Sequence, residues 1–414
     1  MVWTLAVTET VSWGILYYAF AIFLVPMQSS LGANRGQISV AFSLALLGAG
    51  AAAIPVGWWL DRHGARVLMT VGSIVAAVLV VAWSGVTSLL ELYAVFTAIG
   101  VASAAVLYEP AFAVIAVWFR RERQAALLTL TVVAGFASTI FLPLTAYLVG
   151  RFGWREALVI LAALMAVLTV LPHAAILRRR PSDVGFAPDG GERSQGVVPA
   201  SPTAGSLGLG IALRNPALRW LIAAFFVAGL ASTTIQVHLV AYLEDQGRSA
   251  GLAAAVAGSL GALSVGGRLL LSAFSRRLSL STVTAGMLAT AGVCAGIMLL
   301  VPGPLGIAVF VLATGPTFGA MTIARAGLLA SYVDVGRYGR LGGLVALVLT
   351  VSRVAAPATA GALRTLTGSY VVVIVIVGVC MIAAALLLVI AERSAATQRI
   401  GGSHLVESAA SFSQ

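Results

Sequence analysis

Charged residues are scarce in this chain: they make up 9% of its 414 residues, whereas hydrophobic residues make up 60%. A water-soluble chain carries roughly a quarter of its residues as charged side chains. The shortage of charge excludes an ordinary soluble domain, because most of the surface would have nothing polar to present to water. We therefore expect the chain to be embedded in a lipid bilayer.

Cysteine and histidine are also rare, with two and four residues. Cys294 and Cys380 lie inside apolar runs, where a thiol behaves as a small hydrophobic group. The four histidines are scattered, without a second ligand at metal-binding spacing, and no group of His, Asp or Ser has the spacing of a catalytic site. These absences predict no metal site, no cofactor and no enzymatic activity.

Lysine is absent, so all 25 basic residues are arginines, and the formal net charge is +11. A basic chain can indicate a nucleic-acid partner, but these arginines fall between the hydrophobic runs instead of gathering on one amphipathic face. We therefore expect no nucleic-acid partner, and membrane topology explains the arginines better.

Twelve apolar runs fill nearly the whole chain, and each is long enough to cross the roughly 30 Å hydrocarbon core of a bilayer. Trimmed at charges and turn residues, they are expected at about 3–29, 37–60, 67–86, 89–118, 125–149, 156–177, 216–242, 249–273, 280–301, 304–331, 341–363 and 369–391. The predicted fold is an all-α membrane protein with twelve transmembrane helices.

The arginines also predict the orientation of these helices. With the N-terminus inside, 17 arginines lie in the tail and the even-numbered connections, five lie on the opposite side and three lie within runs. Cytoplasmic loops carry such an excess, so both termini are expected in the cytoplasm. No small-residue cleavage site follows the first run, which predicts a retained span. We expect a monomeric, multi-pass protein of the cell inner (plasma) membrane.

Features recur about 214 residues apart, as in Pro143 and Pro357, and predict two pseudo-symmetric six-helix bundles. The expected domains are an N-terminal bundle (1–177), a cytoplasmic linker with a short interfacial helix (178–215, the helix at Ile211 to Arg219), a C-terminal bundle (216–391) and a disordered cytoplasmic tail (392–414). Repeats of this kind place the binding site at their interface, near the bilayer midplane.

The connection between the second and third runs reads Gly57-Trp-Trp-Leu-Asp61-Arg62-His-Gly64-Ala-Arg66. It resembles the signature loop of the major facilitator superfamily, which implies a transporter fold and a gating role for this loop. In this interpretation Gly57 lets two helices approach closely, Asp61 caps or pairs across the cytoplasmic gate, and Gly64 permits the tight turn. The alternative is that Asp61 and Arg62 only solvate a turn.

Further motifs are Tyr17-Tyr18-Ala-Phe20, Pro26-Met27, Arg35, His238-Leu-Val-Ala-Tyr242, Asp245-Gln-Gly247, Gly267-Arg268 and Thr367-Gly368-Ser369-Tyr370. They resemble the monocarboxylate transporter family and its bacterial relatives, which also resemble the oxalate and formate exchangers. The resemblance implies a small carboxylate substrate bound by Arg268. Animal members carry an acidic residue one helical turn before that arginine, whereas this chain has Ser264, so the usual proton-coupling carboxylate is missing.

Five charged residues stand out within the predicted spans: Glu9, Glu109, Arg268, Arg325 and Arg353. An ionised side chain in a span costs about 2.5–3.5 kcal/mol on insertion scales, so such residues face the bundle interior and pair or line a cavity. Two acids and three arginines leave one cation for which a bound anion could compensate. Arg268 is the preferred substrate ligand because its planar fork fits a carboxylate; structural pairing or snorkelling is the alternative.

The other candidates have less specific roles. Arg353, Tyr17 and Tyr108 could contact a bound acid, although tyrosine is common near membrane interfaces, and Arg353 could instead pair with Glu9. Candidate proton-coupling residues are Glu109, which precedes a helix-breaking proline, together with His238 and Glu9. Each has a plain alternative: an ion pair, a hydrogen-bonded helix-end histidine, and an acid exposed at the membrane interface.

Arg325 lies past the Gly315-Pro316 break near the end of the tenth run, and is as well suited to a gate as to a binding site. Taken together, these residues favour a secondary transporter that moves a small organic anion by alternating access, with proton symport or anion exchange. One alternative is a proton-driven exporter of a drug-like or amphipathic metabolite. Another is a non-transporting membrane sensor, although the linker and the tail are too short and too polar to form the soluble signalling domain that a sensor usually carries.

Overall fold

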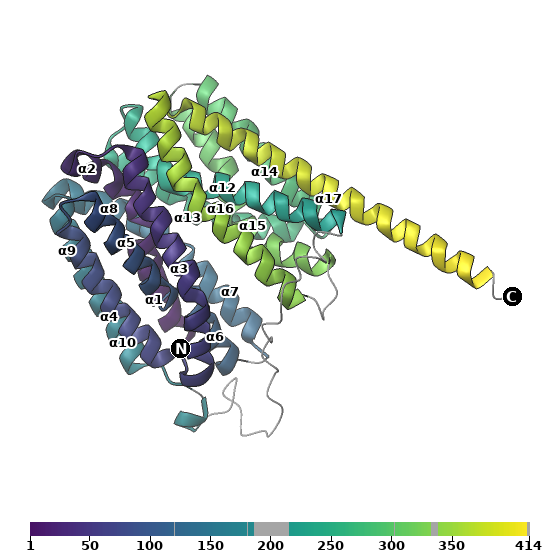
Figure 1. Ribbon diagram of the computed structural model, residues 1–414, viewed down its shortest axis with the longest axis horizontal. Coiled ribbons are helices and arrows are strands. Elements are labelled where there is room, and N and C mark those ends of the chain that lie inside the picture. The colour runs from purple at the N-terminus through teal and green to yellow at the C-terminus, as the bar shows by residue number, and fades with distance from the viewer. Residues whose placement is uncertain (120, 180, 186–214, 302, 333–337, 412–414) are drawn as a thin grey trace. The chain divides into compact units, whose positions relative to one another are not determined.

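The computed structural model describes residues 1–119, 121–179, 181–185, 215–301, 303–332 and 338–411. Every regular element in these ranges is helical (Figure 1). Eleven stretches among them are long and apolar enough to cross a membrane. One more helix, α16 (Tyr338–Thr367), covers the eleventh predicted run at about 341–363 and completes the set of twelve. The twelve-helix, all-α prediction is therefore confirmed.

The first six spans are built partly from shorter helical pieces. The elements are α1 (Val2–Trp13), η1 (Gly14–Tyr18), α2 (Phe20–Leu31), α3 (Arg35–His63), α4 (Ala65–Ser84), α5 (Leu89–Ala104), α6 (Tyr108–Trp118), α7 (Arg123–Ala134), α8 (Ala137–Phe152), α9 (Trp154–Met165), η2 (Ala166–Val170) and α10 (Leu171–Ala175). The first span, Val2–Leu31, thus contains a π-helical turn, η1, between α1 and α2. Such turns occur frequently at functional sites.

The later spans are mostly single long helices. After the short 3-10 turn η3 (Pro181–Val184) come α12 (Pro216–Asp245), α13 (Ala250–Phe274), α14 (Leu280–Leu300), α15 (Pro304–Tyr332), α16 and α17 (Val371–Ser411). Proline lies inside α15 at Pro316 and inside α16 at Pro357. A proline removes one backbone hydrogen bond from a helix, so each marks a local weak point in its span.

Contacts group the chain into two compact units. One contains Met1–Pro199, Thr233–Val265 and Arg353–Val373, and the other contains Ala200–Ser232, Gly266–Ser352 and Ile374–Gln414. The first unit thus includes the Asp245 end of α12 and the Arg364 end of α16. This grouping cuts through helices, so it does not test the predicted boundary between two six-helix bundles, which stays a prediction.

The core of the first unit combines two kinds of packing. Aromatic side chains fill its centre, where Phe20 and Phe42 stack at a centroid distance of 4.8 Å and Trp83 meets Phe96 edge-on at 4.7 Å. Small residues serve at close crossings, where Gly100 of α5 lies against the backbone of Ala45 in α3 with no room for a Cβ. Close approach of small residues is how helices pack without a hydrophobic driving force in lipid.

The predictions for the linker and for the tail can be compared with the structure to different extents. Residues 186–214 lie outside the described ranges, and with them most of the predicted linker and the start of the predicted interfacial helix, while α12 begins at Pro216. The tail is predicted to be disordered from 392, but α17 continues as one helix to Ser411 (Figure 1). The stretch is polar and lacks proline, which would interrupt a helix, although Gly401 and Gly402 weaken one.

Candidate functional site

A capping box fixes the start of α3. The Asn34 side chain accepts the backbone N–H of Gln37 at 2.9 Å, and the Gln37 side chain accepts the backbone N–H of Asn34 at 2.9 Å. This pattern satisfies two backbone donors that a helix start otherwise leaves unpaired. The first residue of α3 is consequently Arg35, which the capping box holds at the end of the helix.

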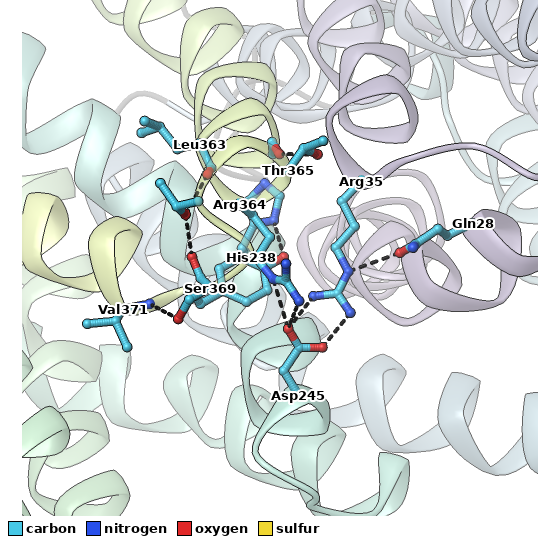
Figure 2. Close-up of polar contacts among 12 residues, drawn as sticks. Gln28, Arg35, His238, Asp245, Leu363, Arg364, Thr365, Ser369 and Val371 are labelled. Carbon is cyan, nitrogen blue, oxygen red and sulfur yellow. Dashed lines mark hydrogen bonds and ion pairs between the residues drawn. The ribbon is translucent and has the colours of Figure 1, made fainter.

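Arg35 meets Asp245, the last residue of α12, and Arg364, near the end of α16. Its Nη1 and Nη2 donate to the two carboxylate oxygens at 2.8 and 2.5 Å. Arg364 donates to Oδ2 from Nε at 3.0 Å, and its Nη2 lies 2.8 Å from the same oxygen. Figure 2 shows both guanidinium groups converging on this carboxylate. Two cations from α3 and α16 therefore share one anion from α12.

Tyr370, in the turn between α16 and α17, supports both arginines. Its ring lies 5.3 Å from the Arg35 guanidinium carbon and 5.5 Å from that of Arg364, within cation–π range. Burial raises the pKa of Tyr370 to about 12, although the two arginines oppose this shift. The hydroxyl therefore keeps its proton at physiological pH and remains a hydrogen-bond donor.

His238 lies beneath Tyr370 and is buried. Its Nε2 lies 3.1 Å from the carbonyl oxygen of Pro357, which can only accept, so Nε2 carries a proton. In the neutral ring Nδ1 then accepts the Tyr370 hydroxyl at 2.9 Å. Both nitrogens are satisfied, so His238 positions Tyr370. We call Gln28, Arg35, His238, Asp245, Arg364 and Tyr370 the Asp245 cluster.

Below Arg35, helices α3 and α16 touch backbone to backbone. A Cβ added to Gly361 would lie 2.8 Å from Ser39 Oγ and 2.9 Å from the Arg35 carbonyl oxygen. Thr365 Oγ1 accepts the N–H of Gly36 at 3.4 Å. The glycine in α16 is therefore required for this contact, which aligns Arg35 with the other members of the Asp245 cluster.

A second close contact joins α8 and α13. Thr139 Oγ1 donates to the carbonyl of Gly258 at 2.7 Å and accepts the N–H of Ala262 at 3.0 Å. A Cβ added to Gly261 would lie 2.7 Å from the Gly135 carbonyl oxygen. Side-chain hydroxyls and missing Cβ atoms thus let α8 and α13 approach closely.

Glu9 occupies an enclosed position in α1. The residue has 0% exposure, and neither carboxyl oxygen has a hydrogen-bond partner among the described residues. Ser12 Oγ and Trp13 Nε1, on the same helix, are likewise buried without a hydrogen bond there, although the Trp13 side chain lies close enough to interact with the Glu9 carboxyl. Exposure at the membrane interface, the alternative considered for Glu9, is therefore wrong. Glu109, an exposed residue in the first turn of α6, lies close enough for the two acids to interact electrostatically.

Trp13 connects two of the predicted substrate contacts. Its ring lies 5.1 Å from that of Tyr17 and 5.0 Å from that of Tyr108. Tyr17 is in turn within electrostatic range of Arg353. Two of the predicted residues therefore contact one tryptophan that the sequence does not single out, and Arg353 interacts with one of them. No ion pair forms between Glu9 and Arg353 in the described chain, so that predicted pairing is wrong.

Arg268 of α13 and Arg325 of α15 belong to the second unit. Arg268 is half-buried and follows Gly267, which lies against the backbone of Pro316. Arg325 is exposed. Each already takes part in a noncovalent interaction. The count of two acids against three arginines therefore does not by itself identify Arg268 or Arg325 as the cation that an anion must compensate.

Two arginines cap helix ends around the signature loop. Arg66 donates from Nε and Nη2 to the carbonyl of Ala174 at 3.1 and 2.7 Å, and Arg179 donates to the carbonyl of Arg62. Carbonyls at a helix C-terminus lack backbone partners, so these contacts stabilise the ends of α10 and α3. Gly64 adopts φ +78° beside Arg179, a backbone conformation that glycine adopts without strain.

The remaining signature-loop residues are Gly57, Asp61 and Arg62. Among the described residues, a Cβ added to Gly57 would meet nothing within 4 Å, so the structure shows no close helix approach there. Arg62 lies over the Trp58 ring at 3.9 Å. The side chain of Asp61 lies outside the part of the chain that the structure describes, so its gating role stays a prediction.

The Asp245 cluster is the main feature that sequence reasoning missed. The sequence places Arg35, Asp245 and Tyr370 within family motifs and Arg364 among the five arginines on the side opposite the termini, without indicating that they pair. Charged residues next to a predicted span end, of opposite sign on different spans, are the signal that could have identified it.

Comparison with known proteins places these features in a family context. The family model "Major Facilitator Superfamily" matches residues 3–357. Monocarboxylate transporter 13 of Bos taurus is 29% identical over 345 residues, covering 80% of this chain and 74% of that protein. Monocarboxylate transporter 11 of Homo sapiens is 30% identical over 334 residues, covering 77% and 67%.

A solved structure is similar over almost the whole length. It is the inward-facing, unoccupied form of a bacterial homologue of the human lysosomal transporter Spinster, with a TM-score of 0.71 and 95% of each chain covered. The sequence identity is 15%, so this likeness concerns the fold alone.

Proposed function

Because the chain belongs to the major facilitator superfamily, and is thus a secondary transporter, we propose that it carries a small organic anion of the monocarboxylate type. It does so by alternating access, in which a central site opens to one side of the membrane at a time. We further propose the inner membrane as its location, with both termini in the cytoplasm, and a monomer as the working unit.

The Asp245 cluster is the observation that carries this proposal. It joins α3 to α12 and α16 through four donor–acceptor contacts to one carboxylate. The three side chains keep 11–24% of their exposure, so water can reach the contacts and replace them. A carrier needs contacts that close one end firmly yet can be exchanged, and this cluster has both properties.

The substrate class rests on the relatives and on one arginine. Both relatives described above are named as monocarboxylate transporters. We propose that Arg268 binds the substrate carboxylate with its planar fork, exchanging its present interaction for the substrate. Arg353, Tyr17 and Tyr108 would complete the site, since Trp13 and its neighbours already hold the tyrosines in place.

Glu9 is the proposed coupling acid. An ionised carboxylate without a hydrogen-bond partner is very costly to bury, so enclosure favours the neutral, protonated group. Inward movement of a lone anion against an inside-negative potential costs about 2.3 kcal/mol per charge per 100 mV. A proton carried on Glu9 would cancel that charge. Glu109, close by and exposed, would exchange the proton with solvent, whereas His238 serves the Asp245 cluster.

The opposite gate is proposed to lie at the signature loop, with Asp61, Arg62, Gly64, Arg66 and Arg325. Opening there would require the arginine caps on α3 and α10 to adjust together, because Arg179 links Arg62 and Gly64.

A binding experiment tests the proposal. Purified protein would be heated with pyruvate, lactate, acetate, benzoate and oxalate, because a ligand at 100 times its dissociation constant adds about 2.7 kcal/mol to stability. We expect a monocarboxylate to raise the unfolding temperature of the wild type and to raise that of Arg268→Ala much less. No shift with any of the five acids would contradict the substrate class.

A further inference from the structure

Within the Asp245 cluster, the hydrogen-bond donors of Arg35 are shared between two partners, Gln28 and Asp245. Arg35 donates from Nε to Gln28 Oε1 at 3.0 Å. Gln28 belongs to α2, the helix that precedes α3, so this contact does not depend on α12 or α16. Only Nη1 and Nη2 are committed to Asp245. Gln28 thus fixes the guanidinium plane and leaves its outer edge to a carboxylate.

The members of the cluster come from different parts of the chain. Arg35 lies on α3, in the predicted N-terminal six-helix bundle, whereas Asp245 and Arg364 lie on α12 and α16 of the predicted C-terminal bundle. If the repeats separate at this end, as the proposed function requires, Asp245 keeps Arg364 and loses Arg35. Glu244, next to Asp245 and within electrostatic range of Arg35, moves away with α12 as well.

Separation would therefore leave Arg35 as a cation without its anion. Removing one partner of a hydrogen-bonded charge pair is costly because the remaining charge loses its compensation. Gln28 still holds Nε, so Nη1 and Nη2 keep the orientation that fits two carboxylate oxygens. A guanidinium fork with that edge open matches a carboxylate in a bidentate arrangement.

We propose that Arg35 is the first binding site for the substrate carboxylate at this end of the carrier. The substrate replaces Asp245 on Nη1 and Nη2, so that arrival of the anion and opening of the cluster are one exchange. The number of hydrogen bonds to Arg35 is unchanged during this step. A monocarboxylate suffices, because Arg364 stays with Asp245. This inference rests on the proposed function and adds a site distinct from Arg268.

Ser39 offers a probe of this exchange. It is fully buried, one helical turn below Arg35, and lies at the close contact with Gly361. In a chain carrying Cys294→Ala, Cys380→Ala and Ser39→Cys, a maleimide should react with position 39 only when α3 and α16 part. The reaction rate is measured on purified protein with pyruvate, lactate or acetate, and with chloride at the same ionic strength.

We expect one of these carboxylates to accelerate labelling about tenfold over chloride, the ratio that 1.4 kcal/mol of differential binding produces. Arg35→Gln should label rapidly under all conditions and lose the acceleration. Arg364→Gln, the matched control, removes the other guanidinium and should keep the acceleration. Asp245→Asn should label rapidly and bind the carboxylate more tightly than the wild type.

Arg268→Ala separates this inference from the proposed function. If Arg35 is the first site, carboxylates still accelerate labelling in Arg268→Ala. Acceleration that vanishes in Arg268→Ala and survives in Arg35→Gln would overturn the inference and leave the central site standing. No acceleration by any of the three acids in the wild type would also overturn it, whatever the thermal binding experiment gives.

Discussion

Arg35 holds the carboxylate of Asp245 through two parallel hydrogen bonds, of 2.8 and 2.5 Å, although 210 residues separate them in the chain. A planar guanidinium fork fits a carboxylate in only a narrow range of orientations. The contact therefore fixes the position of α3 along α12 and not only the distance between them. Charge-assisted pairs of this geometry are stronger than neutral hydrogen bonds.

Asp245→Asn should destabilise the protein. The variant leaves two guanidinium groups over Tyr370 without an anion, and hydrogen bonds to charged groups contribute about 1.5–3 kcal/mol when buried. Partial exposure of the three side chains reduces the expected loss to about 1 kcal/mol by solvent screening. Thermal unfolding in detergent measures it. Arg151→Gln, at an exposed arginine of α8, is the control and should leave stability unchanged.

Tyr370→Phe tests how much the Tyr370 hydroxyl contributes to stability apart from its ring. The ring would still lie beneath both arginines, but Nδ1 of His238 would lose its donor and remain buried. An unsatisfied buried group of this kind costs about 1–3 kcal/mol. Tyr370→Leu removes the cation–π contacts as well and should be less stable still. Equal unfolding temperatures for wild type and Tyr370→Phe would show that the hydroxyl contact contributes nothing.

Gly361→Ala should prevent the close contact of α3 and α16. The added Cβ would meet backbone atoms of Arg35 and Gly36 at 2.9 Å, which cannot move away as a flexible side chain could. We expect the Asp245 cluster to open and labelling of Ser39→Cys to rise. Gly57→Ala is the matched control, because its Cβ meets nothing within 4 Å. Similar labelling in both variants would contradict the assigned role of Gly361.

Glu9→Gln should uncouple transport from protons. Glutamine has nearly the same shape as a protonated glutamate but cannot release a proton. An outward-acid pH gradient should therefore drive no accumulation in this variant, whereas exchange of substrate for substrate across liposomes should continue. Glu156→Gln, at an exposed acid in the first turn of α9, should retain the response. Loss of exchange together with coupling would instead indicate a structural role for Glu9.

The sequence was sufficient for the twelve helices because each apolar run is long enough to span a bilayer. It was not sufficient for the Asp245 cluster, since the pairing of Arg35 with Asp245 depends on how distant helices pack. Dependence on the packing of distant helices also explains why the expectations for Gly57, Arg268 and Glu9 differ from the structure. Whether Gly57 touches a helix, and whether Arg268 has a partner, is decided by neighbours that no local pattern specifies. The burial of Glu9 likewise depends on the helices around α1.

The proposed function of this member of the major facilitator superfamily is to move a small monocarboxylate together with a proton. The most direct measurement is uptake of radiolabelled pyruvate and lactate into liposomes that contain the purified protein, with and without an acid-outside pH gradient. We predict gradient-driven accumulation of at least one of them in the wild type and none in Arg268→Ala. Protein that moves neither acid, but drives an amphipathic compound against the direction of the proton gradient, would contradict the account.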